Sequence, residues 1–238
     1  MVDNKEIIKE QYTEKLRLSK DNNNSCCNQS IPRLSMKPFE DIPSFGCILN
    51  LPEKAGLTKG DIVVDFGSGP GYDLINAAKI VGSKGRVIGI DMTLAMIENA
   101  KEEIRKSNLE NVEVKMGEIE KVPLDDCIAD VVISNCVINL AANKSAVFKE
   151  AFRILKPGGK LVDADIIAGE DLPESLQNDN ESWCNCIGGA LTQEGYTKAI
   201  KDAGFIDIDI VIDHSIPFKW QGKEIQMYSG IITAKKPT

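Results

Sequence analysis

Two acidic residues and three glycines form the first set of residues in this chain that could bind a ligand. Asp65 lies near the end of an apolar, β-branched stretch, and glycines follow at alternate positions, Gly67, Gly69 and Gly71. Glycines between a strand and a helix let a ligand approach the backbone amides and the positive end of the helix dipole. The second acid, Asp91, comes 20 residues after Gly71, a spacing that suits hydrogen bonds to both hydroxyls of a ribose. A glycine turn that binds nothing has the same composition, so both interpretations stay open at this point.

Seven cysteines form the second set, and they are more than packing in a reducing compartment requires. Thiolates are the soft ligands of proteins, so the set indicates soft-ligand binding or redox chemistry. A permanent disulfide framework is not expected of a cytosolic chain. Each cysteine taken alone is equally well explained as a small buried hydrophobe. The seven are Cys26, Cys27, Cys47, Cys127, Cys136, Cys184 and Cys186.

The composition excludes several classes of function. With 238 residues, 42% of them hydrophobic, the chain is long enough for one domain of generous size. Its formal net charge of −8 and the lack of a Lys/Arg run argue against a nucleic-acid partner. No apolar stretch reaches membrane-spanning length and no signal peptide precedes the polar N-terminus. We therefore expect no membrane partner and a cytoplasmic location.

The elements that must position these residues alternate between strand and helix. Such alternation predicts an α/β fold with a mostly parallel sheet covered by helices on both faces. The last two strands have no helix between them, so we expect an antiparallel final strand. A ligand is expected above the carboxyl ends of the parallel strands. The sequence predicts helices at 5–18, 72–81, 93–107, 143–155 and 192–203, and strands at 61–66, 86–91, 112–116, 129–135, 159–168, 206–215 and 225–235.

Residues 1–50 and 51–238 are expected to have different tasks. The first part holds the predicted N-terminal helix and a polar stretch around Cys26 and Cys27, and we interpret it as a cysteine-bearing lid segment. The helix also fits a simpler interpretation, in which it only caps the domain. Residues 51–238 carry the glycine loop and all the predicted strands, so we interpret them as the ligand-binding domain.

The acid before glycines at every second position resembles the class I methyltransferases, which use S-adenosylmethionine. The resemblance implies a Rossmann-like, mostly parallel seven-stranded sheet with helices on both faces. It also implies that the glycine loop holds the methionyl part of this cofactor and that Asp91 holds its ribose. Asp73 suits the methionyl amino group or the start of its helix, and Glu118 or Ile119 suits the adenine. The residues expected at the cofactor are Asp65, Gly67, Ser68, Gly69, Gly71, Asp73, Asp91, Met92, Glu118, Ile119, Asn135 and Cys136.

Six short elements narrow the resemblance to the arsenite methyltransferases. The similarity runs from about residue 26 to residue 203. Its specific parts are residues 134–140 and 186–191, which general methyltransferases lack. The six elements are Phe45-Gly-Cys47, Asp65-Phe-Gly-Ser-Gly69, Gly89-Ile-Asp-Met-Thr93, Ser134-Asn-Cys-Val-Ile-Asn-Leu140, Leu155-Lys-Pro-Gly-Gly159 and Trp183-Cys-Asn-Cys-Ile-Gly-Gly-Ala-Leu191.

This narrower resemblance implies that thiols hold trivalent arsenic. Cys47 and Cys186 match binding cysteines of the family, and we expect them to act as the catalytic ligands. An N-terminal cysteine of the family matches one of the adjacent thiols at residues 26–27. Its C-terminal cysteine has no counterpart in residues 224–229, and Cys184 is a candidate substitute. The expected arsenic ligands are Cys47, Cys186, Cys26, Cys27 and Cys184.

Arsenic bound by three thiolates keeps a lone pair, which can displace the methyl group from a sulfonium in line. Alignment then supplies most of the catalysis, and no general base is needed. We expect no metal beyond the arsenic substrate, and a thiol reductant of the thioredoxin or glutathione type as partner. Two other functions stay open. A methyltransferase acting on carbon or oxygen of a small molecule, such as a quinone precursor, would leave the cysteines unexplained. A non-catalytic, thiol-based metalloid binder would not need the intact acids and glycines.

Overall fold

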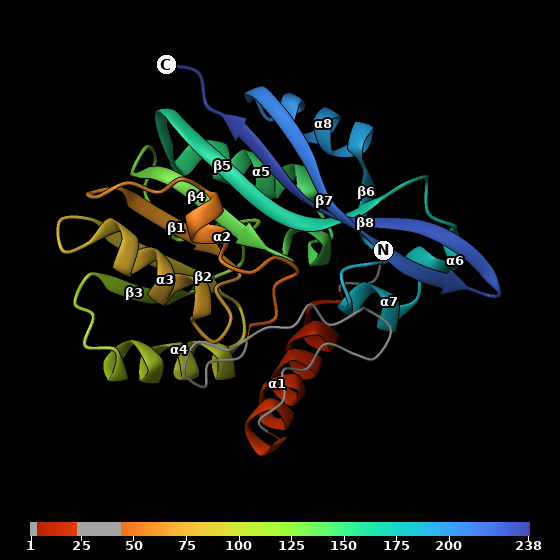
Figure 1. Ribbon diagram of the computed structural model, residues 1–238, viewed down its shortest axis with the longest axis horizontal. Helices are drawn as coiled ribbons and strands as arrows, with labels where there is room; N and C mark the ends of the chain where they lie inside the picture. The colour runs from red at the N-terminus through yellow and green to blue at the C-terminus, as the bar shows by residue number, and fades with distance from the viewer. Residues whose placement is uncertain (1–3, 23–43) are drawn as a thin grey trace.

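A computed structural model describes residues 4–22 and 44–238 of the chain, and a twisted mixed sheet runs through its centre (Figure 1). The strands are ordered β3-β2-β1-β4-β5-β8-β7, and the short β6 pairs with β5 off this path. All pairs are parallel except those of β8, which is antiparallel to both β5 and β7. The strands are β1 (Ile62–Phe66), β2 (Arg86–Asp91), β3 (Val112–Met116), β4 (Ala129–Asn135), β5 (Leu155–Ala168), β6 (Leu191–Thr192), β7 (Ile206–Trp220) and β8 (Lys223–Lys235).

Helices cover both faces of this sheet, as expected from the alternating pattern. α2, α3 and α4 cover one face, and α5 and α8 cover the other (Figure 1). The four longer predicted helices after residue 70 agree with the structure to within one residue at each end. The helices are α1 (Lys5–Asn22), α2 (Leu51–Lys54), α3 (Tyr72–Val81), α4 (Leu94–Lys106), the 3₁₀ helix η1 (Ile138–Leu140), α5 (Lys144–Ile154), α6 (Glu174–Gln177), α7 (Asn180–Cys184) and α8 (Gln193–Asp202).

The predicted seven-stranded path with an antiparallel final strand is confirmed. The two-residue β6 makes the sheet eight-stranded, and so short a strand leaves no periodic pattern in the sequence. β5 begins at Leu155 rather than at residue 159, and its pairing with β4 shifts register between Ala129 and Val131. β7 and β8 form a longer hairpin than predicted, which projects past the other strands (Figure 1).

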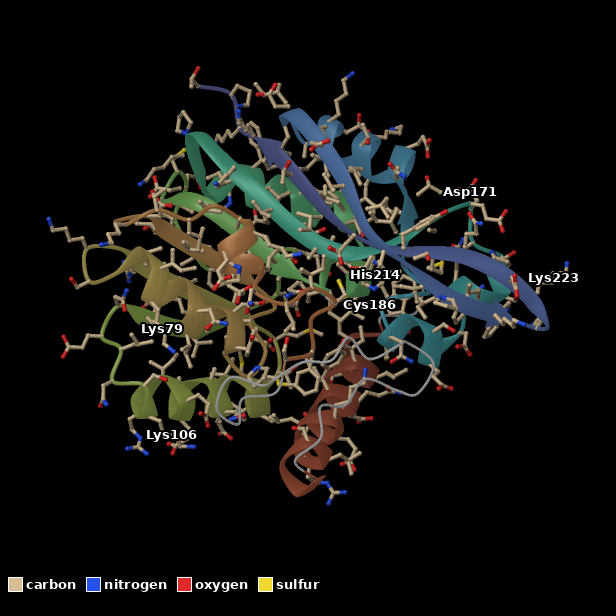
Figure 2. The ribbon with its side chains drawn as sticks, viewed as in Figure 1. Lys79, Lys106, Asp171, Cys186, His214 and Lys223 are labelled. Carbon is tan, nitrogen blue, oxygen red and sulfur yellow. The ribbon has the colours of Figure 1, made fainter. Side chains whose placement is uncertain are left out.

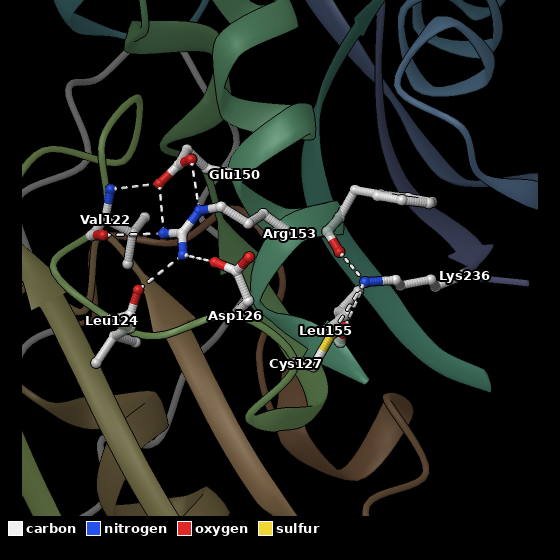
Figure 3. A network of polar contacts seen from close by, with 9 residues as sticks. Val122, Leu124, Asp126, Cys127, Glu150, Arg153, Leu155 and Lys236 are labelled. Carbon is white, nitrogen blue, oxygen red and sulfur yellow. Dashed lines mark hydrogen bonds and ion pairs between the residues drawn. The ribbon is translucent and has the colours of Figure 1, made fainter. Parts of the chain in front are cut away.

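The amino ends of β4 and β5 are held by a cationic network (Figure 3). The Arg153 guanidinium pairs with Glu150 and Asp126 and donates to the Val122 and Leu124 carbonyls. Nearby, Lys236 donates to the carbonyls of Phe152 and Leu155, and lies 3.6 Å from the exposed thiol of Cys127. Cys127 is therefore at the edge of the sheet opposite to the carboxyl ends of the strands, and it has no part in the site described below.

The N-terminal helix α1 lies against the carboxyl edge of the sheet, between α4 and α7 (Figure 1). Its apolar residues Ile8 and Leu16 are buried. None of the helices in residues 4–22 and 44–238 combines the length and the apolar character needed to cross a membrane. The division at residue 50 stays a prediction, since the stretch with Cys26 and Cys27 lies outside the described residues.

Candidate active site

A pocket opens at the carboxyl ends of β1, β2 and β4, the edge at which the sequence predicts a ligand. It holds about 920 Å³ of empty space, part of it open to solvent. Two of the expected residues lie outside its wall. A Cβ built on Gly71 would lie 3.3 Å from Ala100 of α4. Glu118 forms an ion pair with Lys5 at 2.7 Å. The expected cofactor residues in the wall are Asp65, Gly67, Ser68, Gly69, Asp73, Asp91, Met92, Ile119, Asn135 and Cys136.

The glycine loop is held by β2 and needs glycine at its first position. Gly67 has a φ of 68°, and a Cβ built there would lie 2.4 Å from the side chain of Val137. The amides of Gly67 and Ser68 both donate to the carbonyl of Ile90. The loop therefore lies directly on the neighbouring strand, and only a residue without a side chain fits at Gly67.

Asp91 connects the end of β2 to the glycine loop. Its two carboxylate oxygens accept hydrogen bonds from the amides of Gly69 (2.9 Å) and Thr93 (2.8 Å). Burial raises the pKa of this carboxyl, against the effect of the two amides. Each oxygen keeps a lone pair for a further donor. Asp91 can thus bind a hydroxyl-bearing ligand while it fixes the loop.

Asp65 and Asp73 give the pocket acceptor atoms that lack donors. Asp65 Oδ2 and Asp73 Oδ1 are buried without a hydrogen-bond partner. Burial raises the pKa of Asp73 to about 6. Burial, together with the charges of Asp73 and Asp91, holds the pKa of Asp65 well above its usual range. Buried acceptors of this kind are normally paired, so three acids around one pocket suit a ligand that brings ammonium or other cationic groups.

Asn135, at the end of β4, joins this pocket to the segment that carries Cys47. Its amide nitrogen donates to Asp73 Oδ2 (2.9 Å) and to the carbonyl of Ile48 (2.7 Å). Its oxygen accepts from the Ile48 amide at 3.3 Å and from the Cys47 thiol at 3.9 Å. A Cβ at Gly46 would lie 2.3 Å from the Asn135 side chain. The Phe-Gly-Cys element therefore packs directly on Asn135, which explains why glycine precedes Cys47.

Three thiols from separate segments meet beside the pocket. The Cys186 thiol donates to the carbonyl of Cys136 at 2.9 Å, and Figure 2 shows Cys186 where α1, α7 and the central strands converge. Hydrogen bonds with the thiols of Cys186 and Cys47, followed by burial, hold the pKa of Cys136 well above its usual range. The Cys136 hydrogen bond lowers the pKa of Cys47, but burial and the charge of Asp165 outweigh it and raise this pKa overall. Cys47, Cys136 and Cys186 thus form one thiol cluster.

Cys136 belongs to both parts of the site, which the sequence analysis did not predict. It lies in the pocket wall and in the thiol cluster at once. Its position at the carboxyl end of β4 predicted only a place beside the cofactor. Its φ of 59°, like the 62° of Cys186, is a left-handed backbone conformation that sequence patterns do not reveal for cysteine. Cys136 is thus the third thiol of the cluster, beside Cys47 and Cys186.

Of the other candidate ligands, one lies beside the cluster and two cannot be placed. Cys184 is buried in the apolar cluster on α7. Burial, opposed by the charge of Lys15 and assisted by the nearby Cys186 thiol, raises its pKa. Like Cys47, it is outside the group of Cys136, Cys186 and Asp165, whose ligand atoms all lie within 4.8 Å of one another. Cys26 and Cys27 lie outside the described residues. The two expected catalytic cysteines, Cys47 and Cys186, are brought together.

Helix α1 covers the junction between pocket and thiols. Lys5, Ile8 and Tyr12 lie in the pocket wall. The Tyr12 ring packs edge-on against Phe45 with ring centroids 6.1 Å apart. Burial and the nearby Cys186 and Cys136 thiols hold the pKa of Tyr12 well above its usual range. This arrangement favours the interpretation of the helix as part of a lid, and Tyr12 is a site residue that the sequence analysis did not identify.

Several known proteins resemble the chain. Residues 57–204 match a methyltransferase-domain family. The arsenite methyltransferase of Halobacterium salinarum is 40% identical over 189 residues, which cover 77% of this chain and 48% of that protein. The arsenite methyltransferase of Mus musculus is 34% identical over 216 residues, covering 83% of this chain and 57% of that protein.

A solved structure agrees with these similarities. The crystal structure of an arsenic(III) S-adenosylmethionine methyltransferase from Chlamydomonas reinhardtii has a TM-score of 0.67 and 33% identity, and the match covers 75% of this chain and 64% of that one. The chain thus spans between 48% and 64% of the length of these three proteins. The fold is that of the class I methyltransferases. The chain belongs to the methyltransferase-domain family.

Proposed function

We propose that this chain transfers a methyl group from S-adenosylmethionine to trivalent arsenic bound by the thiols of Cys47, Cys136 and Cys186. The observation that carries the proposal is the place of Cys136, which lies in the wall of the cofactor pocket and in the thiol cluster. Relatives at 34–40% identity are named arsenite methyltransferases. We therefore favour Cys136 as the third arsenic ligand, in place of Cys26, Cys27 or Cys184.

The residues of the pocket fit S-adenosylmethionine, which supplies a methyl group on a positively charged sulfur. The unpaired oxygens of Asp65 and Asp73 would accept from its ammonium group, and Asp91 would accept from the ribose hydroxyls. Ile119 and Met92 lie in the pocket wall and would supply apolar contacts to the adenosine. Three acids in one buried pocket also favour the positive charge of the sulfonium.

The thiol cluster fits trivalent arsenic. Arsenic binds sulfur in preference to oxygen. When an arsenic–sulfur bond replaces an arsenic–hydroxyl bond, the departing hydroxyl takes the thiol proton and leaves as water. Three such bonds leave the arsenic lone pair free. Asn135 fixes the segment of Cys47 against the pocket, so alignment of the lone pair with the methyl group is the chain's main contribution to catalysis.

Methyl transfer to the lone pair oxidises arsenic formally from the trivalent to the pentavalent state. A thiol reductant of the thioredoxin or glutathione type is therefore part of the proposal, because it returns two electrons per methyl group. A reducing compartment such as the cytoplasm would keep this reductant and the free thiols available.

The test is incubation of the full chain with radiolabelled S-adenosylmethionine, arsenite and a thiol reductant, followed by separation of the methylated arsenic species. Replacement of any of Cys47, Cys136 or Cys186 by serine should abolish the product, because a hydroxyl is a hard and weakly acidic ligand. Cys127→Ser, at the opposite edge of the sheet, is the control and should remain active. Label found in no arsenic species, with transfer to a quinone-type acceptor instead, would favour the small-molecule methyltransferase. Tight arsenite binding without any transfer would favour the metalloid binder.

A further inference from the structure

A buried carboxylate lies among the thiols and has no role in the arsenic chemistry. Asp165, on β5, has an exposure of 0%. One of its carboxylate oxygens and the Sγ atoms of Cys136 and Cys186 all lie within 4.8 Å of one another. Within residues 4–22 and 44–238, no other three cysteine, histidine or acidic side chains bring their ligand atoms so close together.

This donor set suits a divalent ion that binds both sulfur and oxygen. Trivalent arsenic takes three sulfurs in a pyramid, whereas Zn²⁺ takes four ligands, thiolates and carboxylates among them, in a tetrahedron. With Zn–S of about 2.3 Å and Zn–O of about 2.0–2.2 Å, ligands around one ion lie roughly 3.5–3.8 Å apart. The distances between the three donor atoms, which are at most 4.8 Å, therefore have to shorten by only about 1 Å to fit such an ion.

Neighbouring polar groups already hold the carboxylate and one thiol in place. The Asn139 amide donates to Asp165 Oδ2 at 3.0 Å, and the Ile166 amide donates to Asp165 Oδ1 at 2.8 Å. The Asn139 side chain donates to the carbonyl of Cys186 at 3.0 Å and accepts from the Tyr196 hydroxyl. Each Asp165 oxygen retains a lone pair for a metal. Hydrogen bonds that orient the ligands in this way are typical of metal sites.

We propose that Cys136, Cys186 and Asp165 bind a thiophilic divalent cation, represented by Zn²⁺, at a site that shares two thiols with arsenic. Binding replaces three metal–water bonds of the hydrated ion by two metal–sulfur bonds and one metal–oxygen bond, and the two thiol protons pass to the solvent water. The fourth position is open to the Cys47 thiol or to water. Cys136 lies in the pocket wall, which provides the path by which the ion enters. Competition with arsenite rests on the proposed function, whereas metal binding itself does not.

The test uses the full chain with Cys26, Cys27 and Cys127 replaced by serine, so that these three thiols do not bind metal. Zn²⁺ affinity is measured by competition with a chromophoric chelator. Co²⁺ is added in a parallel experiment, because its thiolate charge-transfer absorption reports metal–sulfur bonds directly. We expect one tight Zn²⁺ per chain and a thiolate–Co²⁺ spectrum that is lost in Cys136→Ser and in Cys186→Ser.

The decisive variant is Asp165→Asn, with Asp163→Asn as its matched control. Both carboxylates are fully buried on β5, but Asp163 is not part of the group. Asp165→Asn should weaken Zn²⁺ binding at least about tenfold while it retains arsenite binding, and Asp163→Asn should leave both unchanged. Calorimetric binding of S-adenosylmethionine to each variant verifies that the pocket is folded.

Three results would overturn the metal site. The first is that Asp165→Asn binds Zn²⁺ as tightly as the parent chain does. The second is that Asp165→Asn loses arsenite binding as well as Zn²⁺ binding. The third is that the parent chain binds no Zn²⁺. Saturating arsenite should abolish the Co²⁺ spectrum, and its persistence would show that the thiols are not shared. Failure of arsenite methylation with an intact Co²⁺ spectrum would count against the proposed function alone.

Discussion

The side-chain nitrogen of Asn135 lies 2.9 Å from Asp73 Oδ2, so the last residue of β4 holds a carboxylate at the start of α3. The same nitrogen donates to the carbonyl of Ile48, next to Cys47. One side chain therefore positions both a proposed cofactor ligand and the segment of a proposed arsenic ligand. Changes at Asn135 should affect both halves of the site, whereas changes at Asp73 should affect one.

Replacing Asn135 with alanine should weaken the binding of S-adenosylmethionine and of arsenite together. The change leaves the Ile48 backbone groups and an Asp73 oxygen without partners, at about 1–3 kcal/mol for each unpaired group. One such loss corresponds to roughly 5- to 150-fold in affinity. Titration calorimetry measures both ligands on the same variant. Asp73→Asn is the comparison and should weaken only the cofactor. Unchanged arsenite affinity in Asn135→Ala would show that Cys47 does not depend on this contact.

The affinity for S-adenosylmethionine should fall as the pH drops below about 6. Burial raises the pKa of Asp73 to about 6 in the free chain, and an ammonium ligand favours the ionised carboxylate. Below this pH the ligand must displace a proton, so the logarithm of the binding constant should decrease by about one for each pH unit. The same raised pKa stabilises the free chain at low pH, and this stabilisation is lost as the pH rises through about 6. Affinities measured between pH 5 and 8, together with loss of the step near pH 6 in Asp73→Asn, would verify the assignment.

Asp91→Ala should lower cofactor affinity by about 5- to 150-fold, because it removes the ribose acceptor and frees the Gly69 and Thr93 amides, at a cost of about 1–3 kcal/mol. Asp61 provides a control of similar geometry, since it also accepts from a backbone amide, that of Thr58 at 2.7 Å. Asp61 lies at the amino end of β1, so Asp61→Ala should lower stability without changing cofactor affinity. Equal calorimetric affinities of the Asp91 and Asp61 variants would refute the role of Asp91.

Alanine at Gly67 should be much more harmful than alanine at Gly222. Both glycines have a positive φ, 68° and 80°, so each substitution places alanine in the left-handed region at a cost of about 1–2 kcal/mol. A Cβ at Gly67 meets Val137 at 2.4 Å, whereas a Cβ at Gly222 meets nothing within 4 Å. Urea unfolding should therefore show a larger loss for Gly67→Ala, accompanied by loss of cofactor binding. Similar unfolding free energies for the two variants would mean that Val137 moves aside without penalty.

The parts of this fold that could be predicted from the sequence are those with a repeating local pattern. The helices at 72–81 and 93–107 and the strands from β1 to β4 repeat apolar residues at regular spacing, and the structure agrees closely. α2, α6 and α7 are a single turn or little more, and neighbouring segments rather than their own residues determine them. Short elements of this kind leave no period to detect.

The glycine loop and its acids could be found because their spacing is local, whereas the thiol cluster depends on tertiary contacts. Asp165 lies just beyond the last residue of β5 that pairs with β4. The predicted strand 159–168 includes it, but no motif in the sequence indicates that it reaches the thiols. Cys136 was expected beside the cofactor, and its second role follows from a backbone conformation at φ 59° and from the position of Cys186. Glu118 is a loop acid that the sequence could not distinguish from a pocket residue, and in the structure it pairs with Lys5 of α1 while its neighbour Ile119 lies in the pocket wall.

The thiol cluster combines residues that lie far apart along the chain: Cys47 precedes β1, Cys136 follows β4 and Cys186 follows α7. During synthesis the ribosome releases the first two thiols long before the third, and the first two do not come together until β1 and β4 have paired. In a chain that is still being made, the three thiols of this cluster are therefore separate. Tight capture of a soft ion by the cluster is coupled to completion of the sheet.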